Sequence, residues 1–170
     1  MDCKEFYFKG KEDLDIHVYK WTSKIVNPKA VVQIAHGMSE TAIRYEEFAK
    51  KLTENGYIVY INDHRGHGLT AKTIDNVGYL ADKDGFRCLV EDMNTLTNII
   101  KEENPDLPIY LFGHSMGSFA SQRYIMEYGN QLDGLYYLVQ MENTVKFWKL
   151  ENFYQITYVK NMEEGIEVRL

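Results

Sequence analysis

Hydrophobic and polar residues alternate along the first part of the chain and then give way to short apolar runs. Residues 5–9 and 14–21 alternate around the turn-forming residues 10–13, which is typical of an antiparallel hairpin at the edge of a sheet. Three later segments are nearly continuously apolar, as expected of parallel strands covered on both faces: residues 30–35, 57–61 and 109–112. The chain is therefore expected to form a sheet with an antiparallel edge and a parallel centre.

Apolar residues recur at helical spacing in three segments that alternate with these strands: residues 44–55, 84–103 and 118–128. Gly56 and Gly129 follow the first and third segments as helix-ending residues, and Asn104-Pro105 ends the second. The expected buried faces are Tyr45, Phe48, Ala49 and Leu52 in the first helix, and Phe86, Leu89, Val90, Met93, Leu96, Ile99 and Ile100 in the second. With a further strand opening at residues 132–135, the order predicts one α/β domain with helices on both faces of a mostly parallel sheet.

Composition narrows the range of partners. The 170 residues carry a net charge of −6 and show no cluster of Lys and Arg, which argues against a nucleic-acid surface and favours a small molecule or lipid. Cys3 and Cys88 give neither a disulfide framework nor a metal-binding spacing, so both are expected to be free thiols in a reducing compartment. The charged start of the chain and the absence of a long apolar window predict neither a signal peptide nor a membrane span, and hence a cytoplasmic location.

The pentapeptide Gly113-His114-Ser115-Met116-Gly117 lies between an expected strand and an expected helix. This context predicts a nucleophile elbow, the strained turn that lifts a serine hydroxyl clear of a sheet. Glycine is expected on both sides of the serine because the packed backbone leaves no room for Cβ atoms. Ser115 is therefore the candidate nucleophile.

The segment His36-Gly37-Met38-Ser39-Glu40 follows the first parallel strand, where an elbow enzyme supplies part of its oxyanion hole. The backbone N–H of Met38 is one candidate donor. The other is the backbone N–H of Met116, which follows the serine at the start of a helix. Two amides aimed at one oxygen would stabilise a tetrahedral oxyanion.

A third motif, Asp63-His64-Arg65-Gly66-His67-Gly68, follows the next strand. We expect Asp63 and Arg65 to support the loops around the site through hydrogen bonds, with His64 and His67 orienting the turn. A metal site formed by His64 and His67 is the weaker alternative because no clustered partner is evident. Asp92, within the second helix, is expected to be a buried hydrogen-bonding anchor.

Together with Arg44-Tyr45, the three motifs resemble the monoacylglycerol lipase/lysophospholipase group of α/β-hydrolases, from the start of the chain to about Leu135. Ser39 stands where many members have glycine, and its small side chain keeps the oxyanion role of Met38. The resemblance implies an α/β-hydrolase fold and hydrolysis of a single-chain acyl ester by a Ser-His-Asp triad under a helical lid. We expect no cofactor and no metal, and transient contact with a membrane surface is compatible with the sequence.

The acid and base of such a triad follow the serine in the chain. No histidine follows Ser115, and the only later aspartate, Asp133, starts a strand and so lies at the wrong end of the sheet. His114 is expected to point away from the serine, and the earlier histidines His36, His64 and His67 occupy positions with other roles. Without a base the chain is expected to be close to inactive.

Residues 136–170 depart from the family pattern. They could be interpreted as an amphipathic membrane-docking helix, but their Thr, Val and Tyr content disfavours a helix. We favour the loss of one base after the codon for Leu135: restoring it lets the following codons read Leu-Ile-Leu-Ser-Gly-Thr-Asn-Gly, a family-like strand and loop. The expected organisation is residues 1–135 as the N-terminal part of a hydrolase domain and residues 136–170 as a divergent tail.

Three alternatives remain open. The chain could be a non-catalytic module that binds acyl groups, or a truncated product that aggregates through an uncovered sheet. Within enzymes, a related peptidase or acyltransferase would use the same elbow and oxyanion loop.

Overall fold

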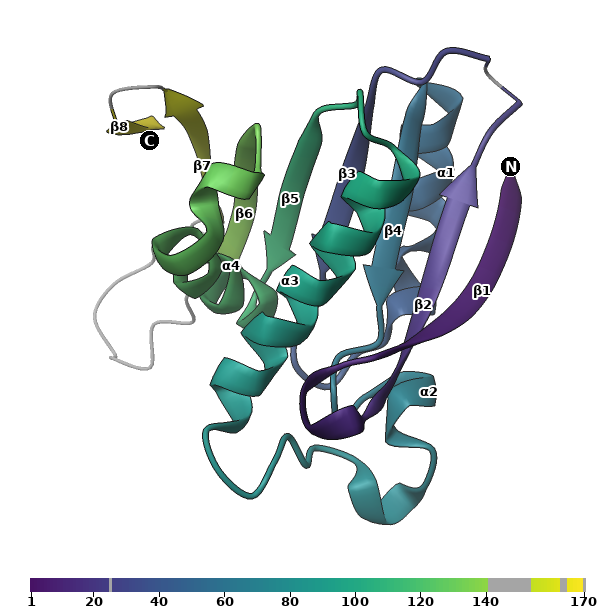
Figure 1. Ribbon diagram of the computed structural model, residues 1–170, viewed down its shortest axis with the longest axis vertical. Helices are drawn as coiled ribbons and strands as arrows, with labels where there is room; N and C mark the ends of the chain where they lie inside the picture. Colours follow the sequence, from purple (N-terminus) through teal and green to yellow (C-terminus); the bar gives the residue numbers. More distant parts are fainter. Residues whose placement is uncertain (25, 141–153, 163–164, 170) are drawn as a thin grey trace, which may run out of the picture.

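A single twisted sheet organises the protein, shown in Figure 1 as a computed structural model. The structure describes residues 1–24, 26–140, 154–162 and 165–169. Within these residues the strand order is β1-β2-β4-β3-β5-β6-β7-β8. The strands are β1 Asp2–Lys9, β2 Asp15–Thr22, β3 Ala30–Ala35, β4 Tyr57–Asn62, β5 Ile109–His114, β6 Gly134–Gln140, β7 Tyr154–Met162 and β8 Gly165–Arg169.

The predicted division between an antiparallel edge and a parallel centre is confirmed. Strands β1 and β2 form the antiparallel hairpin, with Asp2 opposite Thr22, and β2 pairs antiparallel with β4. Strands β4, β3, β5 and β6 are parallel to one another. Their carboxyl ends therefore meet at one edge of the sheet, where open α/β sheets place their ligand sites.

Helices cover both faces of this sheet, as predicted. They are α1 Glu46–Glu54, α2 Gly68–Ala71, α3 Gly85–Glu103 and α4 Met116–Tyr128, with 3₁₀ helices at Lys11–Asp13, Ala42–Tyr45, Ile74–Asn76 and Gly129–Gln131. In Figure 1, α3 and α4 lie in front of the sheet and α1 lies behind it. No helix within the described residues is long and apolar enough to cross a membrane.

Strand alternation gives each face its own core. Val31 packs into a cluster with Leu89 of α3 and Ala120 of α4, whereas Val32 packs with Ala49 of α1. Successive side chains of a strand point to opposite faces, so the continuous apolar run of β3 serves both clusters. All six residues of β3 are buried, which explains why its bounds could be predicted from the sequence.

Two details of the helices differ from the predictions. The segment expected to be helical from residue 44 begins as a 3₁₀ turn, and its α-helix starts at Glu46. Gly56, at φ +92°, ends it as expected. The predictions that Phe48 and Phe86 belong to buried faces are wrong. Phe48 of α1 is 39% exposed, and Phe86 is 37% exposed because it lies in the first turn of α3, at the rim of the core.

The tail contains elements that the sequence did not predict. β7 pairs antiparallel with β6, and β8 pairs antiparallel with β7. The amphipathic-helix interpretation is therefore wrong for residues 154–162, which form a strand. Its other part, residues 145–150, lies outside the described residues.

Candidate active site

Ser115 occupies the turn between β5 and α4 in a strained conformation, with φ 50° and ψ −117°. Positive φ is uncommon for any residue other than glycine and persists only where the surroundings impose it. Two hydrogen bonds fix the turn: the Ser115 N–H donates to the carbonyl of Leu138 over 2.9 Å, and the Ser118 N–H donates to the Ser115 carbonyl over 2.9 Å. The backbone thus has the shape that the elbow prediction requires.

Close packing explains the two glycines of the elbow. A Cβ atom at Gly117 would overlap the carbonyl oxygen of Ala35, at the end of β3. A Cβ atom at Gly113 would lie 2.7 Å from the carbonyl oxygen of Gly117. Larger residues would therefore push α4 away from the strands that carry the site.

The loop after β3 lies directly against the serine. A Cβ atom at Gly37 would lie 3.2 Å from the Cβ atom of Ser115. The next residue, Met38, has a side chain that is 69% exposed, and Ser39 follows at φ +59°. The Ser39 N–H donates to Nε2 of His67 over 3.4 Å, which ties this loop to the loop after β4. The structure thus brings together the two segments that carry the candidate oxyanion donors.

Glu40 holds the two segments together, a role that the sequence pattern did not predict. Its carboxylate is 6% exposed and accepts hydrogen bonds from the Gly37 N–H over 2.5 Å, the Tyr45 hydroxyl over 2.7 Å and Nδ1 of His114 over 2.9 Å. Burial alone would raise the pKa of Glu40, but these three hydrogen bonds outweigh it and hold the pKa below its ordinary value. Glu40 ends the motif at residues 36–40 and Tyr45 follows five residues later, and this closeness in the chain was the available signal.

The histidines near the site are engaged in structural contacts. Nδ1 of His36 donates to the carbonyl of Gly37 over 2.7 Å, and Nε2 of His36 accepts from the His64 N–H over 3.0 Å. Burial lowers the pKa of His36 to about 4 and the pKa of His64 well below its ordinary value. Both rings are therefore neutral at pH 7, and the expectation that they have roles other than catalysis agrees with these contacts.

Asp63, Arg65 and Asp92 form the predicted supports. Oδ1 of Asp63 accepts from the Ala42 N–H over 2.8 Å, and Oδ2 accepts from the Leu69 N–H over 3.0 Å. Nε of Arg65 donates to Oδ2 of Asp92 over 2.7 Å, with both side chains almost fully buried. These contacts confirm the structural interpretation of the third motif and of Asp92.

The remaining candidates lie where the sequence predicted. Asp133 accepts a hydrogen bond from the Ile109 N–H over 2.8 Å at the start of β5, so it lies at the opposite edge of the sheet from Ser115. Nδ1 of His114 faces Glu40 and lies 2.9 Å from the Tyr45 hydroxyl. In the part of the chain that the structure describes, no histidine ring forms a hydrogen bond with the Ser115 hydroxyl, and no three His, Cys, Asp or Glu side chains could hold a metal ion.

A family model described as "Serine aminopeptidase, S33" matches residues 26–139. The chain is 36% identical over 133 residues to a monoacylglycerol lipase of Mycolicibacterium smegmatis. The aligned region covers 78% of this chain and 43% of that protein. It is 34% identical over 90 residues to human monoglyceride lipase, covering 53% of this chain and 28% of that protein.

Solved structures of hydrolases superpose on this chain. A thermostable carboxyl esterase from Bacillus coagulans superposes with a TM-score of 0.73 at 36% identity, covering 79% of this chain and 43% of that one. A monoglyceride lipase variant from Saccharomyces cerevisiae superposes with a TM-score of 0.64 at 21% identity, which shows the shared fold alone. The chain spans less than half the length of the curated relatives it matches.

Proposed function

Because the chain belongs to the serine aminopeptidase S33 family, among the α/β-hydrolases of the monoacylglycerol lipase/lysophospholipase group, we propose that it carries the nucleophilic part of a carboxylic-ester hydrolase. Ser115 is the proposed nucleophile, and the backbone N–H groups of Met38 and Met116 are the proposed oxyanion donors. The observation that carries the proposal is the strained elbow at Ser115 with the Gly37 loop packed against it.

The substrate class proposed is a lipid ester with one acyl chain, of the monoacylglycerol or lysophospholipid type. The relatives that support this are named monoacylglycerol lipase, monoglyceride lipase and lysophospholipase. The Ser115 hydroxyl would attack the ester carbonyl, and the developing negative charge on its oxygen would accept hydrogen bonds from the two amides.

Such an attack needs a base to accept the serine proton. The neutral ring of His36 is buried and held by backbone groups, the neutral ring of His64 is buried beside the Asn62 amide, and His114 faces Glu40. We therefore propose that the chain of 170 residues reacts slowly, because it encodes the nucleophile and the oxyanion donors but no histidine after Ser115.

Labelling with a fluorophosphonate probe tests both parts of this proposal. We expect slow labelling, relative to the Bacillus coagulans esterase, that disappears in Ser115→Ala and persists in Thr73→Ala, which removes an exposed hydroxyl outside the proposed site. Labelling as fast as that of the esterase would refute the slow reaction. Labelling that survives Ser115→Ala would refute the assignment of the nucleophile.

A further inference from the structure

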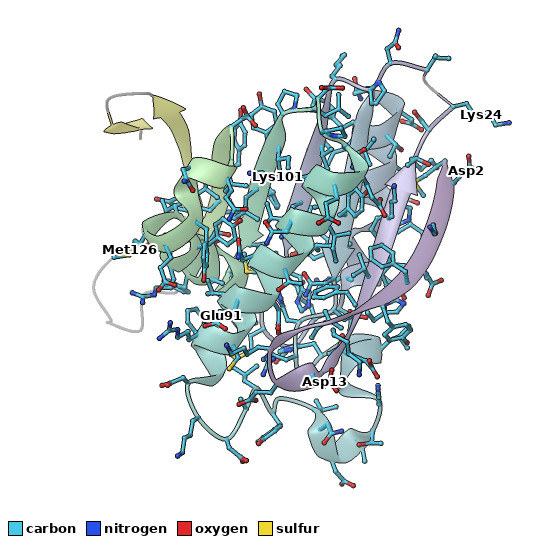
Figure 2. The ribbon with its side chains drawn as sticks, viewed as in Figure 1. Asp2, Asp13, Lys24, Glu91, Lys101 and Met126 are labelled. Carbon is cyan, nitrogen blue, oxygen red and sulfur yellow. The ribbon has the colours of Figure 1, made fainter. Side chains whose placement is uncertain are left out.

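The imidazole ring of His17, in β2, lies between two carboxylates and is only 1% exposed. Its Nε2 atom lies 3.0 Å from Oε2 of Glu5, and its Nδ1 atom lies 3.4 Å from Oδ2 of Asp63. Glu5 belongs to β1, which runs from Asp2 towards Asp13 along the outer edge of the sheet (Figure 2). Asp63 follows β4, the neighbour of β2 on the other side. One buried ring therefore meets an acidic group from each side of its strand.

Backbone contacts fix the ring in this position. The Asp63 N–H donates to the carbonyl of His17 over 3.0 Å, and the His17 N–H donates to Oγ1 of Thr70 over 2.9 Å. The Thr70 hydroxyl in turn donates to the carbonyl of Asp63 over 2.7 Å. The rings of Tyr7 and Tyr19 pack edge-on against the imidazole, with centroids 4.9 and 4.6 Å away. Turning the ring away from Asp63 would break this packing.

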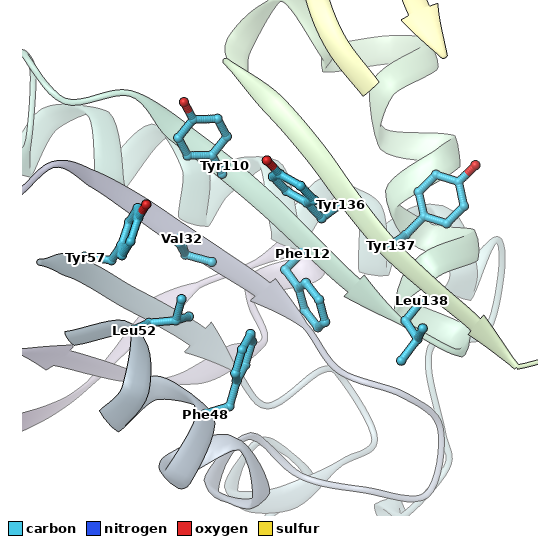
Figure 3. A pocket seen from close by; sticks show the side chains of 9 residues that line it. All are labelled: Val32, Phe48, Leu52, Tyr57, Tyr110, Phe112, Tyr136, Tyr137 and Leu138. Carbon is cyan, nitrogen blue, oxygen red and sulfur yellow. The ribbon is translucent and has the colours of Figure 1, made fainter. Parts of the chain in front are cut away.

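The two carboxylates and the two phenols are the titratable groups that face the ring. His17 and Tyr19 are two residues apart on β2, so both side chains lie on the α1 side of the sheet. Burial raises the pKa of Tyr19 to about 12, and burial together with two nearby carboxylates, one of them Glu46 of α1, raises the pKa of the Cys3 thiol on β1. Both groups are therefore neutral at pH 7. The groove beside α1 on this side is lined by apolar and tyrosine side chains (Figure 3), so it brings no charge to the ring.

Asp63 connects the ring to the candidate active site. Its carboxylate is 2% exposed, and its Oδ1 atom accepts the N–H of Ala42, which follows the loop after β3. Its Oδ2 atom accepts the N–H of Leu69 in α2 and is also the atom that faces the ring. A change in the attraction between the ring and this carboxylate therefore acts on both segments that the carboxylate holds.

The number of protons on the ring decides how many of its contacts are attractive. A neutral imidazole has one N–H donor, and its other nitrogen presents a lone pair. A single proton at Nε2 serves Glu5, in line with the shorter contact, and leaves a lone pair facing the carboxylate of Asp63. A second proton, taken up from solvent, replaces this repulsion with an ion pair that is shielded from water. The buried carboxylate then has a cationic partner.

We propose that His17 is a proton-dependent clamp on the loop after β3. With a proton on both ring nitrogens, the imidazolium bridges Glu5 and Asp63 and keeps the Asp63 carboxylate on the N–H groups of Ala42 and Leu69. With one proton fewer, the lone pair repels that carboxylate and both segments are held more loosely. The loop that carries a proposed oxyanion donor is thus held more tightly at mildly acidic pH. The inference goes beyond the proposed hydrolysis, since the clamp needs no nucleophile.

Nitrogen NMR of the histidine rings and amide hydrogen exchange, on the full chain between about pH 5 and pH 8, test the clamp. We expect the protection factors of the Ala42 and Leu69 amides to rise about fivefold or more as His17 takes up its second proton. His17→Phe keeps an aromatic ring but has no nitrogen, so it should abolish this rise. The matched control Tyr7→Phe removes only a hydroxyl beside the ring and should keep it. Protonation of the buried His36 acts in the opposite direction, so the difference between wild type and His17→Phe isolates the clamp.

The bridge to β1 has its own test. Glu5→Gln keeps a hydrogen-bond acceptor but loses the charge, so the second proton should bind to His17 at a pH lower by about half a unit or more. Asp2→Asn removes a carboxylate from the other face of β1 and should leave this midpoint unchanged. Equal midpoints in wild type and Glu5→Gln would overturn the bridge. Protection that is independent of pH in wild type, or that rises equally in His17→Phe, would overturn the clamp.

The outcome does not depend on one variant or on the chemistry of the elbow. If His17→Phe does not fold, the comparison of wild type with Glu5→Gln decides the proposal by itself, through both the ring midpoint and the protection of the Ala42 amide. None of these measurements uses the hydroxyl of Ser115. Failure of the proposed hydrolysis would therefore leave them unchanged, and failure of the clamp would leave the assignment of the nucleophile unchanged.

Discussion

The carboxylate of Glu40 lies 2.9 Å from Nδ1 of His114 and joins the loop after β3 to the elbow after β5. The same oxygen atom accepts the N–H of Gly37, whose neighbour Met38 carries a proposed oxyanion donor. One buried carboxylate therefore fixes the separation between that donor and Ser115. A displacement of about 1 Å between reacting groups can cost on the order of 10²-fold in rate, so this contact bears directly on the proposed chemistry.

Replacing Glu40 by alanine should destabilise the protein. The change leaves the donors of Gly37, Tyr45 and His114 without their acceptor, and an unsatisfied buried donor costs about 1–3 kcal/mol. Urea denaturation should show this loss in the free energy of unfolding, with a smaller loss in Glu40→Gln, which keeps an acceptor. The control Glu102→Ala removes an exposed carboxylate of α3 and should stay within about 0.5 kcal/mol. Similar values for Glu40→Ala and the control would argue against the bridging role.

Stability should fall as the pH falls below neutrality, because His36 resists protonation in the folded state. The folded-state pKa of His36 is about 4, against 6.5 for a free histidine. Between these values the unfolded chain binds a proton that the folded chain does not, so the contribution is complete above pH 6.5 and lost towards pH 4, by about 3 kcal/mol. The lowered pKa of Glu40 adds a loss of the same sign at more acidic pH. An NMR titration that showed His36 taking up its proton near pH 6.5 would contradict this.

Gly117→Ala should be among the most damaging small substitutions in the chain. Its Cβ atom would overlap the carbonyl oxygen of Ala35, and backbone on both sides prevents easy relief; such overpacking typically costs about 1–3 kcal/mol. Gly129→Ala is the matched control, since it lies at φ −58° and its Cβ atom would meet Ile125 at an ordinary 3.5 Å. Thermal melts should show a lower midpoint for the first variant and an unchanged or higher one for the second. Equal midpoints would mean that the elbow can shift away from β3.

Sequence patterns predicted those features whose cause is local. The apolar run of β3, the elbow around Ser115 and the helix-ending Gly56 each follow from residues that are neighbours in the chain. The role of Glu40 could not be predicted in this way, because the donor of His114 lies 74 residues away in the chain and only the fold brings it to Glu40. The strands of the tail were missed because pairing with other strands sets their register, β7 on β6 and β8 on β7, and no family pattern extends to them.

Restoring the reading frame after Leu135 should restore the reactivity of Ser115. The family match ends at residue 139, close to the point where we infer the loss of one base. Restoring that base in an expression plasmid, with the downstream bases of the locus, should give a chain that encodes an aspartate and a histidine after Ser115. Because triad residues act as a unit, fluorophosphonate labelling of Ser115 should then rise by several orders of magnitude. Restoration together with Ser115→Ala is the control and should abolish the gain. An intact frame at the locus, or a restored frame without a histidine codon, would show that residues 136–170 are the genuine continuation of this chain.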